Sequence, residues 1–318
     1  MKVSLIEPLG VSEAIILEYG QKISDLGHEF EYYDSKTQVV DELVTRADDA
    51  DILMIANNPL PAEVIVKLKN LKLLNVAFTG IDHVDTDALS TIGASICNAS
   101  GYSDPAVAEL VIGLVLDLYR SISRGDKLTR VSGVGTAGKE IKGKTVGIIG
   151  TGNIGLETSK LFHAFGAKLI GYSRTEKNEF IELGGVYKTL DEVLSESDIV
   201  SIHVPSNDQT ENMIGHEELS KMKKSAIFIN CARGRVVDND ALAKVLNDQL
   251  IAGAGIDVFD MEPPVPSDYP LLSAKNAILT PHVAYLTEEA MIRRAEIAFD
   301  NTISFLQGNP KNIIDIKK

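Results

Sequence analysis

Three features are scarce in this sequence: cysteine, long hydrophobic runs and positive charge. The two cysteines, Cys97 and Cys231, lie far apart in the chain, which predicts no disulfide framework and fits a reducing cytoplasm. The longest apolar stretch, residues 107–119, contains Glu109 and Asp117 and is too short to cross a bilayer. The formal charge of -14 opposes the phosphate backbone of nucleic acids. We therefore expect a cytoplasmic protein with no membrane or nucleic-acid partner.

The 318 residues, 44% hydrophobic and 24% charged, fit a globular chain of about two domains. Short β-rich apolar runs alternate with helical stretches in two series, a rhythm that predicts parallel sheets covered by helices. The predicted class is α/β, with two Rossmann-like or flavodoxin-like domains. The strands expected in the first series are residues 3–6, 30–33, 52–56, 73–78 and 94–97, and those in the second are 144–149, 168–172, 199–204, 226–230, 253–258 and 277–279.

Two long helices are expected where the chain passes between these domains. Asp104 followed by Pro105 is typical of a helix start, and Thr287 can cap a second helix that stops before Gly308. Because this second helix follows the second series of strands, the chain is expected to cross back and make the first domain discontinuous. The expected domains are residues 1–99 plus 284–318, and residues 100–283.

A glycine-rich turn, G-T-G-N-I-G at residues 150–155, directly follows an expected strand and opens a helix. Gly150 permits the tight turn, Gly152 lets the backbone approach a pyrophosphate, and Gly155 lets the helix pack closely. The amides at the helix start, at Asn153 and Ile154, supply positive potential. In this context the turn predicts a dinucleotide site in the domain of residues 100–283.

The next expected strand ends in Ser173-Arg174-Thr175, where an NAD enzyme usually carries an acid for the ribose hydroxyls. Two hydroxyls and a guanidinium form a reasonable cradle for a 2′-phosphate, because no carboxylate repels the ligand. The sequence therefore favours NADP(H). NAD(H) stays possible, since Arg174 can also be a solvated surface residue and Glu176 lies nearby.

Arg233, Glu262 and His282 each follow an expected strand of the second series. Taken singly, they could be a surface ion-pair residue, a loop carboxylate and a structural histidine. Because the carboxyl ends of parallel strands meet at one edge of the sheet, all three could converge beside a bound nicotinamide. Their shared position at strand ends favours a catalytic role. No motif for a metal ion accompanies them.

In these motifs the sequence resembles the D-isomer-specific 2-hydroxyacid dehydrogenase family over nearly the whole chain. The ordered combination is specific for the family but not for one substrate. The motifs are Gly150-x-Gly152-x-x-Gly155, Asn230-x-Ala232-Arg233-Gly234, Asp257-Val258-Phe259, Glu262-Pro263, Pro281-His282, Gly80-Ile81-Asp82-His83-Val84-Asp85 and Val107-Ala108-Glu109.

The resemblance implies a nicotinamide-dependent reduction of a small 2-keto acid to the D-2-hydroxy acid. Arg233 would pair with the substrate carboxylate and polarise the keto oxygen. His282 would donate the proton, and Glu262 would orient His282 and favour its imidazolium. The first domain would bind substrate and the second the dinucleotide. Further residues implied for the substrate site are Asn57, Thr79, Gly80, Ile81 and Tyr102, and those implied for the cofactor site are His203, Pro205, Thr210, Cys231, Ala232, Asp257 and Ala284.

Among the family's activities, a glyoxylate or hydroxypyruvate reductase is favoured because it suits NADPH. Asn57-Asn58-Pro59-Leu60 stands where enzymes of 3-phosphoglycerate are expected to carry arginine, and Glu262 stands where formate dehydrogenases are expected to carry glutamine. A bulkier 2-hydroxy acid, 3-phosphoglycerate, phosphite and a corepressor-like binding function remain alternatives. The resemblance also implies a homodimer.

Overall fold

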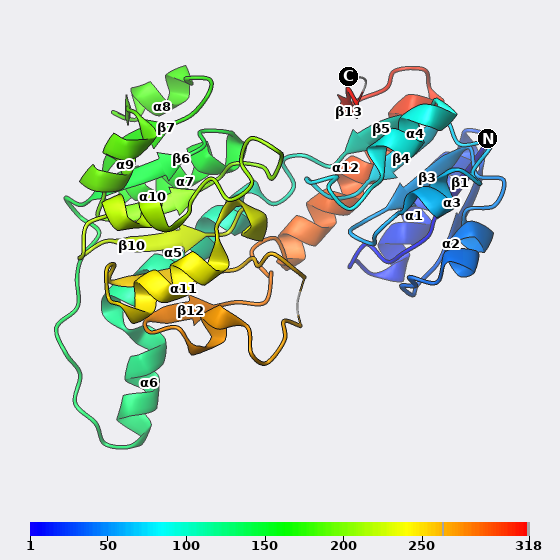
Figure 1. The fold of residues 1–318 in the computed structure, drawn as a ribbon. Helices are drawn as coiled ribbons and strands as arrows, with labels where there is room; N and C mark the ends of the chain where they lie inside the picture. The colour runs from blue at the N-terminus through cyan, green and yellow to red at the C-terminus, as the bar shows by residue number, and fades with distance from the viewer. Residues whose placement is uncertain (263, 317–318) are drawn as a thin grey trace. The chain divides into compact units, whose positions relative to one another are not determined.

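The computed structural model describes residues 1–262 and 264–316, and the chain divides into two compact units (Figure 1). Unit 1 comprises Met1–Ser103 and Leu286–Lys318, and unit 2 comprises Asp104–Tyr285. Each unit is built on one sheet with helices packed against it. The α/β class with two sheets and a discontinuous first domain is confirmed.

Unit 1 has a six-stranded sheet in the order β13-β5-β4-β3-β1-β2. Every pairing is parallel except that of β13 with β5. The antiparallel β13 departs from the expected all-parallel sheet, because two apolar residues are too short for a sequence pattern. The strands are β1 (Lys2–Leu5), β2 (Glu29–Tyr32), β3 (Ile52–Ile55), β4 (Leu73–Val76), β5 (Ser95–Asn98) and β13 (Ile313–Ile314), and the helices are α1 (Glu13–Asp25), α2 (Val40–Arg46), α3 (Ala62–Ile65), α4 (Thr86–Ile92) and α12 (Glu288–Leu306).

Helix α12 returns to unit 1 because its buried face completes the core of that unit. Phe299 is fully buried and stacks on Tyr19 of α1 with ring centroids 4.9 Å apart. The Asn75 amide of β4 donates to the Ala298 carbonyl oxygen at 2.6 Å and to the Thr302 hydroxyl at 2.8 Å. The expected cap is present, since the Thr287 side chain accepts from the amide of Ala290. These contacts hold the second chain segment in the first unit.

Unit 2 has a seven-stranded parallel sheet in the order β12-β11-β10-β9-β6-β7-β8. The strand order reverses between β6 and β9, and ligands of open α/β sheets bind at such a switch point. The strands are β6 (Thr145–Ile149), β7 (Lys168–Tyr172), β8 (Val186–Tyr187), β9 (Ile199–Ile202), β10 (Ile227–Asn230), β11 (Gly253–Ile256) and β12 (Ala277–Leu279). The helices are α5 (Asp104–Arg120), α6 (Ile122–Arg130), α7 (Asn153–Ala164), α8 (Asn178–Glu182), α9 (Leu190–Glu196), α10 (His216–Lys221) and α11 (Asn239–Asn247), with 3-10 turns at Gly234–Val236 and Pro270–Ser273.

Among residues 1–262 and 264–316, no helix is both long enough and apolar enough to cross a bilayer.

Candidate active site

The glycine turn of residues 150–155 joins β6 to α7 in a shape that side chains would obstruct. Gly150 has a φ of +96°, and a Cβ there would lie 2.7 Å from the His203 carbonyl oxygen. A Cβ on Gly155 would lie 2.0 Å from the Gly150 carbonyl oxygen, whereas one on Gly152 would meet nothing within 4 Å. The first and third glycines therefore serve the turn itself, and the open side of Gly152 at the start of α7 fits a pyrophosphate.

The segment after β7 carries the residues expected to select the cofactor. Arg174 and Thr175 are exposed and Ser173 is half-buried. Arg174 Nη1 donates to the Gln209 side-chain oxygen at 3.2 Å. This hydrogen bond joins the guanidinium to the loop after β9. The other N–H groups of Arg174 have no partner among the described residues. This arrangement fits an anionic group at the end of β7.

His203 and Thr210 lie in that loop after β9. Burial of the ring lowers the pKa of His203 to about 3, so the imidazole is neutral at physiological pH. Its Nε2 lies 2.9 Å from the Ser201 hydroxyl, and its buried Nδ1 has no hydrogen-bond partner in the described part of the chain. The Thr210 hydroxyl donates to the Pro205 carbonyl oxygen at 2.6 Å. The Thr210–Pro205 hydrogen bond therefore closes the loop. The unpaired Nδ1 of His203 fits a hydrogen bond to a ligand beside the glycine turn.

Arg233 lies in the turn that follows β10. The Asn230 side chain accepts from the Ala232 amide at 3.0 Å and donates to the Arg233 carbonyl oxygen at 3.0 Å. Arg233 Nη1 donates to the Ala232 carbonyl oxygen at 2.8 Å, and the residue is half-buried. Cys231, between them, is buried, and burial raises the pKa of its thiol well above the ordinary range. The Asn230 side chain therefore closes the turn, and the buried Cys231 thiol is neutral.

Gly234 brings the Arg233 turn against the loop that carries Glu262. A Cβ on Gly234 would lie 1.8 Å from the carbonyl carbon and oxygen of Phe259, and 2.4 Å from the Asp260 nitrogen. Only a glycine allows this contact between two backbones. Two of the three expected catalytic residues therefore project from loops in direct contact. Pro263, which follows Glu262 in the family motif, lies outside the described residues.

His282 and Glu262 form a hydrogen-bonded pair. His282 Nδ1 lies 2.8 Å from Glu262 Oε2, with the histidine side chain 15% exposed and the glutamate 75% exposed. His282 has a φ of +55°, a left-handed conformation that is strained for a residue other than glycine. A restraint from the surrounding structure must hold it.

Asp257, at the end of β11, supplies that restraint. Its main-chain oxygen accepts from the His282 amide at 2.8 Å. Its fully buried carboxylate accepts from the Thr280 hydroxyl at 2.5 Å, the Val283 amide at 2.9 Å and the Ala284 amide at 2.8 Å. Burial raises the pKa of Asp257, although these hydrogen bonds act in the opposite direction. The resemblance placed Asp257 near the nicotinamide and missed this positioning role, for which its place directly after a strand is the only sequence signal.

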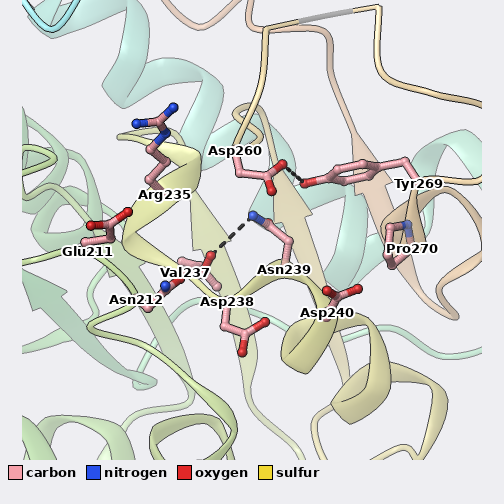
Figure 2. Close-up of a pocket in the computed structure, with 10 residues that line it drawn as sticks. All are labelled: Glu211, Asn212, Arg235, Val237, Asp238, Asn239, Asp240, Asp260, Tyr269 and Pro270. Atoms are coloured by element: carbon pink, nitrogen blue, oxygen red, sulfur yellow. Dashed lines mark hydrogen bonds between the residues drawn. The ribbon is translucent and has the colours of Figure 1, made fainter.

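A cavity of about 550 Å³ in unit 2 lies beside the loops that carry Arg233 and Glu262 (Figure 2). Arg235 and Asp260, from those two loops, both line it. The Tyr269 hydroxyl donates to Asp260 Oδ1 at 2.6 Å, and the Asn239 amide donates to the Val237 carbonyl oxygen at 3.2 Å. None of the residues expected in the catalytic or cofactor site lines this cavity, so we assign it to support of the loops.

The residues expected to bind substrate lie in loops of unit 1. Thr79, Gly80 and Ile81 follow β4, and the Asn98 side chain donates to the Thr79 carbonyl oxygen at 2.7 Å. Tyr102 is only 1% exposed and packs on Phe78 with ring centroids 6.0 Å apart, so the structure gives its ring a packing role. Asn57 follows β3 and accepts a hydrogen bond from Lys36, a residue that sequence reasoning missed.

The glycine turn at the switch point, with an arginine and a histidine–glutamate pair at neighbouring strand ends, defines a nicotinamide-dependent oxidoreductase. Residues 112–284 match the model of the D-isomer specific 2-hydroxyacid dehydrogenase NAD binding domain. A glyoxylate reductase of Thermofilum pendens is 39% identical over 278 residues, 84% of this chain and 82% of that one. A glycerate dehydrogenase of Methylorubrum extorquens is 38% identical over 91% of this chain and 92% of that one. The structure of an acyclic imino acid reductase in complex with NADPH and D-Arg superposes with a TM-score of 0.88 at 30% identity, covering 99% and 100% of the two chains.

The chain belongs to the D-isomer-specific 2-hydroxyacid dehydrogenase family, as the resemblance implied. It is an NAD(P)-dependent oxidoreductase that interconverts a 2-keto acid and a D-2-hydroxy acid.

The close contact at Gly234 leads to a prediction about stability. Gly234→Ala is expected to lower the free energy of unfolding by about 1–3 kcal/mol, because its Cβ forces the two loops apart, and to lower activity because Arg233 moves with its turn. Gly113→Ala is the control, since Gly113 is an exposed helix residue with nothing within 4 Å of an added Cβ. That change should be neutral or stabilising by up to about 1 kcal/mol. Equal unfolding free energies for the two variants, measured by urea denaturation, would contradict the prediction.

Proposed function

We propose that this protein reduces small 2-keto acids, glyoxylate and hydroxypyruvate foremost, and prefers NADPH as the hydride donor. The observation that carries the proposal is the His282–Glu262 pair, 2.8 Å apart, on strand ends next to the Arg233 turn. A bound nicotinamide supplies the hydride. This chain's residues must then bind the acid, polarise its keto oxygen and deliver one proton.

The three side chains divide these tasks by their chemistry. Arg233 pairs with the substrate carboxylate and polarises the keto oxygen, because its planar fork is permanently charged and donates two parallel bonds. His282 donates the proton to the oxygen as negative charge develops there. Because Nδ1 is engaged by Glu262, we assign the donation to Nε2. Thr79, Gly80 and Ile81 hold the carboxylate from unit 1, and Asn57 contributes to the substrate site.

The substrate assignment is supported by the names of the relatives. One is a glyoxylate reductase, and another is a glycerate dehydrogenase, whose 2-hydroxy acid has hydroxypyruvate as its keto counterpart. The loop after β3 carries Asn57, Asn58 and Pro59 and has no arginine for a phosphate. The test is a turnover screen of glyoxylate, hydroxypyruvate, pyruvate, 4-methyl-2-oxopentanoate, 3-phosphohydroxypyruvate and phosphite, each with the matching form of both cofactors. Preference for the branched or phosphorylated acid would reject the assignment.

We propose that unit 2 binds the dinucleotide and unit 1 contributes the substrate loop. The glycine turn would hold the pyrophosphate through the amides at Asn153 and Ile154. The remaining expected contacts come from the segment after β7 and from the loops after β9, β10, β11 and β12. They are Ser173, Arg174, Thr175, His203, Pro205, Thr210, Cys231, Ala232, Asp257 and Ala284.

The preference for NADPH depends on Arg174. Arg174→Ala is expected to lower the ratio of kcat/KM for NADPH to that for NADH by about tenfold or more, because it removes a charged donor from the 2′-phosphate. Lys168→Ala is the matched control, since it removes one positive charge from the exposed amino end of the same strand. A wild-type enzyme at least tenfold better with NADH would refute the cofactor assignment.

A cytoplasmic homodimer is part of the proposal. Helix α6 has no buried residue and projects from the body of unit 2 (Figure 1). Ile122, Val131 and Val134, in α6 and the segment after it, are 58%, 75% and 87% exposed. Apolar side chains on such an arm favour burial against a second copy. Light scattering that gives the mass of one chain, 34.4 kDa, would argue against the dimer.

A further inference from the structure

Lys36 is a cation at the carboxyl edge of the unit 1 sheet. Its Nζ donates to Asn57 Oδ1 at 2.6 Å and lies 3.6 Å from Glu7 Oε2. The side chain is 49% exposed, and the hydrogen bond to Asn57 uses one of the three N–H groups of the ammonium. Glu7 follows β1, Lys36 follows β2 and Asn57 follows β3. Three neighbouring strand ends thus contribute one polar cluster.

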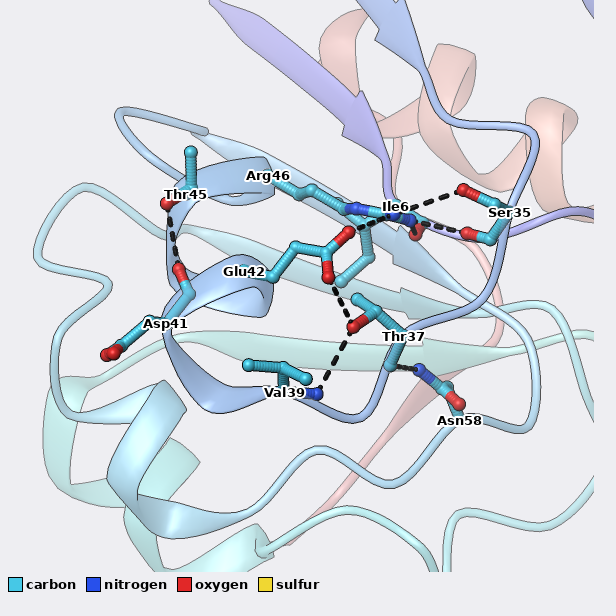
Figure 3. Close-up of polar contacts among 9 residues, drawn as sticks. All are labelled: Ile6, Ser35, Thr37, Val39, Asp41, Glu42, Thr45, Arg46 and Asn58. Atoms are coloured by element: carbon cyan, nitrogen blue, oxygen red, sulfur yellow. Dashed lines mark hydrogen bonds and ion pairs between the residues drawn. The ribbon is translucent and has the colours of Figure 1, made fainter.

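The backbone on both sides of Lys36 is fixed by buried side chains (Figure 3). Arg46, 6% exposed, donates to both the carbonyl oxygen and the hydroxyl of Ser35. Asn58, 4% exposed, donates to the Thr37 carbonyl oxygen. These bonds fix the main chain from which Lys36 projects, so less backbone conformational entropy is lost when its side chain binds a ligand.

Glu7 sets the charge of the cluster. It is fully buried, and its Oε1 accepts from the amides of Ala56 and Asn58 at 2.6 and 3.0 Å. Its Oε2 faces the Lys36 ammonium and has no hydrogen-bond partner within the described residues. The carboxylate offsets the ammonium, so the pair has little net charge. A second carboxylate or a phosphate on the substrate therefore gains little here, whereas a neutral hydroxyl fits.

The cluster lies next to the loop expected to hold the substrate carboxylate. The Leu60 amide donates to the His83 carbonyl oxygen at 2.9 Å, and the Asp85 amide donates to the Leu60 carbonyl oxygen at 3.2 Å. These bonds join the loop after β3, which carries Asn57, to the loop after β4, which begins at Thr79. A substrate held by its carboxylate at Thr79–Ile81 would extend its C3 substituent along this pair of loops.

We infer that Lys36, together with Asn57, recognises a hydroxyl on C3 of the 2-keto acid. The inference rests on the proposed function and makes 3-hydroxy-2-keto acids such as hydroxypyruvate the preferred class among the substrates that have a C3. Lys36 donates to the hydroxyl oxygen, and the hydroxyl donates to the second lone pair of Asn57 Oδ1. A methyl group at C3 leaves both polar groups unpaired, which is the source of the discrimination.

The test compares hydroxypyruvate with pyruvate, which lacks only the hydroxyl. Wild-type kcat/KM should favour hydroxypyruvate, and Lys36→Met should lower the hydroxypyruvate-to-pyruvate ratio by about tenfold or more. Lys69→Met is the control, an exposed lysine of the same unit whose side chain has no partner in the described residues; its ratio should match the wild type. If Lys36→Met fails to fold because Glu7 loses its counterion, Glu7→Gln/Lys36→Met removes both charges and should show the same fall.

Three outcomes would overturn the inference. The first is a wild-type preference for pyruvate, and the second is an unchanged ratio in folded Lys36 variants. A third is that oxaloacetate is the better substrate and loses most in Lys36→Met, which would make Lys36 an anion site. If the wild type turns over none of these acids, the proposed function itself fails. An active enzyme with an unchanged ratio rejects the role of Lys36 alone.

Discussion

His282→Ala is expected to lower kcat for keto-acid reduction by about 10²–10⁴-fold and to abolish the pH dependence that the histidine causes. In the wild type, reduction should decline as pH rises, because His282 must begin protonated. Oxidation should rise over the same range, because the ring must then begin neutral. Glu262→Gln should lower kcat in both directions, since a neutral amide holds the His282 ring less strongly than the carboxylate that lies 2.8 Å from Nδ1. The measurement is kcat/KM against pH in both directions, with cofactor binding followed separately.

Two controls separate proton transfer from loss of fold. His282 has a left-handed backbone, which asparagine adopts more readily than alanine, so His282→Asn should show the same kinetic loss with a more stable loop. His163→Ala removes an exposed histidine from α7 and should leave the profile unchanged. An active His282→Asn variant with the wild-type pH profile would overturn the assignment.

The fold was predictable because the sheets are made of apolar runs of strand length. The expected runs at 52–56, 73–78 and 253–258 nevertheless overshoot β3, β4 and β11 by one or two residues. The predicted strands are too long because Ala56, Phe78 and Val258 remain buried although they no longer pair with a neighbouring strand. A pattern of apolar residues indicates burial, whereas the end of a strand depends on its hydrogen bonds. The sequence therefore could not show at which residue each of these loops begins.

The catalytic residues were predictable because each has a suitable chemical group and belongs to a motif that follows a strand. Arg233, Glu262 and His282 lie in the loops that follow β10, β11 and β12, and parallel topology brings such loops to one edge of the sheet. The network around Lys36 has no comparable signal. Glu7, Lys36 and Asn57 come from three separate loops and meet only when β1, β2 and β3 are adjacent. Contacts between residues far apart in sequence require the register of the sheet, which composition and spacing do not encode.

Arg233→Lys is expected to lower kcat/KM for keto acids on the order of 10²–10³-fold although the charge is retained. The Asn230 side chain donates to the Arg233 carbonyl oxygen, and Arg233 Nη1 donates to the Ala232 carbonyl oxygen, so both ends of the arginine are restrained by the turn. A carboxylate can meet the planar guanidinium through two parallel bonds. A lysine ammonium is a point donor, and it lacks the fork that would bind the carboxylate while polarising the keto oxygen.

Arg235→Lys is the matched control for this prediction. Arg235 lies two residues further along the same turn, is exposed, and is not among the residues expected in the catalytic or cofactor site, so an exchange that keeps its charge should change kcat/KM by no more than about twofold. Steady-state rates at saturating cofactor would be measured for both variants, with cofactor affinity determined by fluorescence titration to exclude an indirect effect. Because the Arg233 fork acts on the developing oxyanion as well as on the bound acid, kcat should fall and not KM alone. A lysine variant that raises only KM would leave Arg233 a role in binding the carboxylate and would remove it from stabilisation of the transition state.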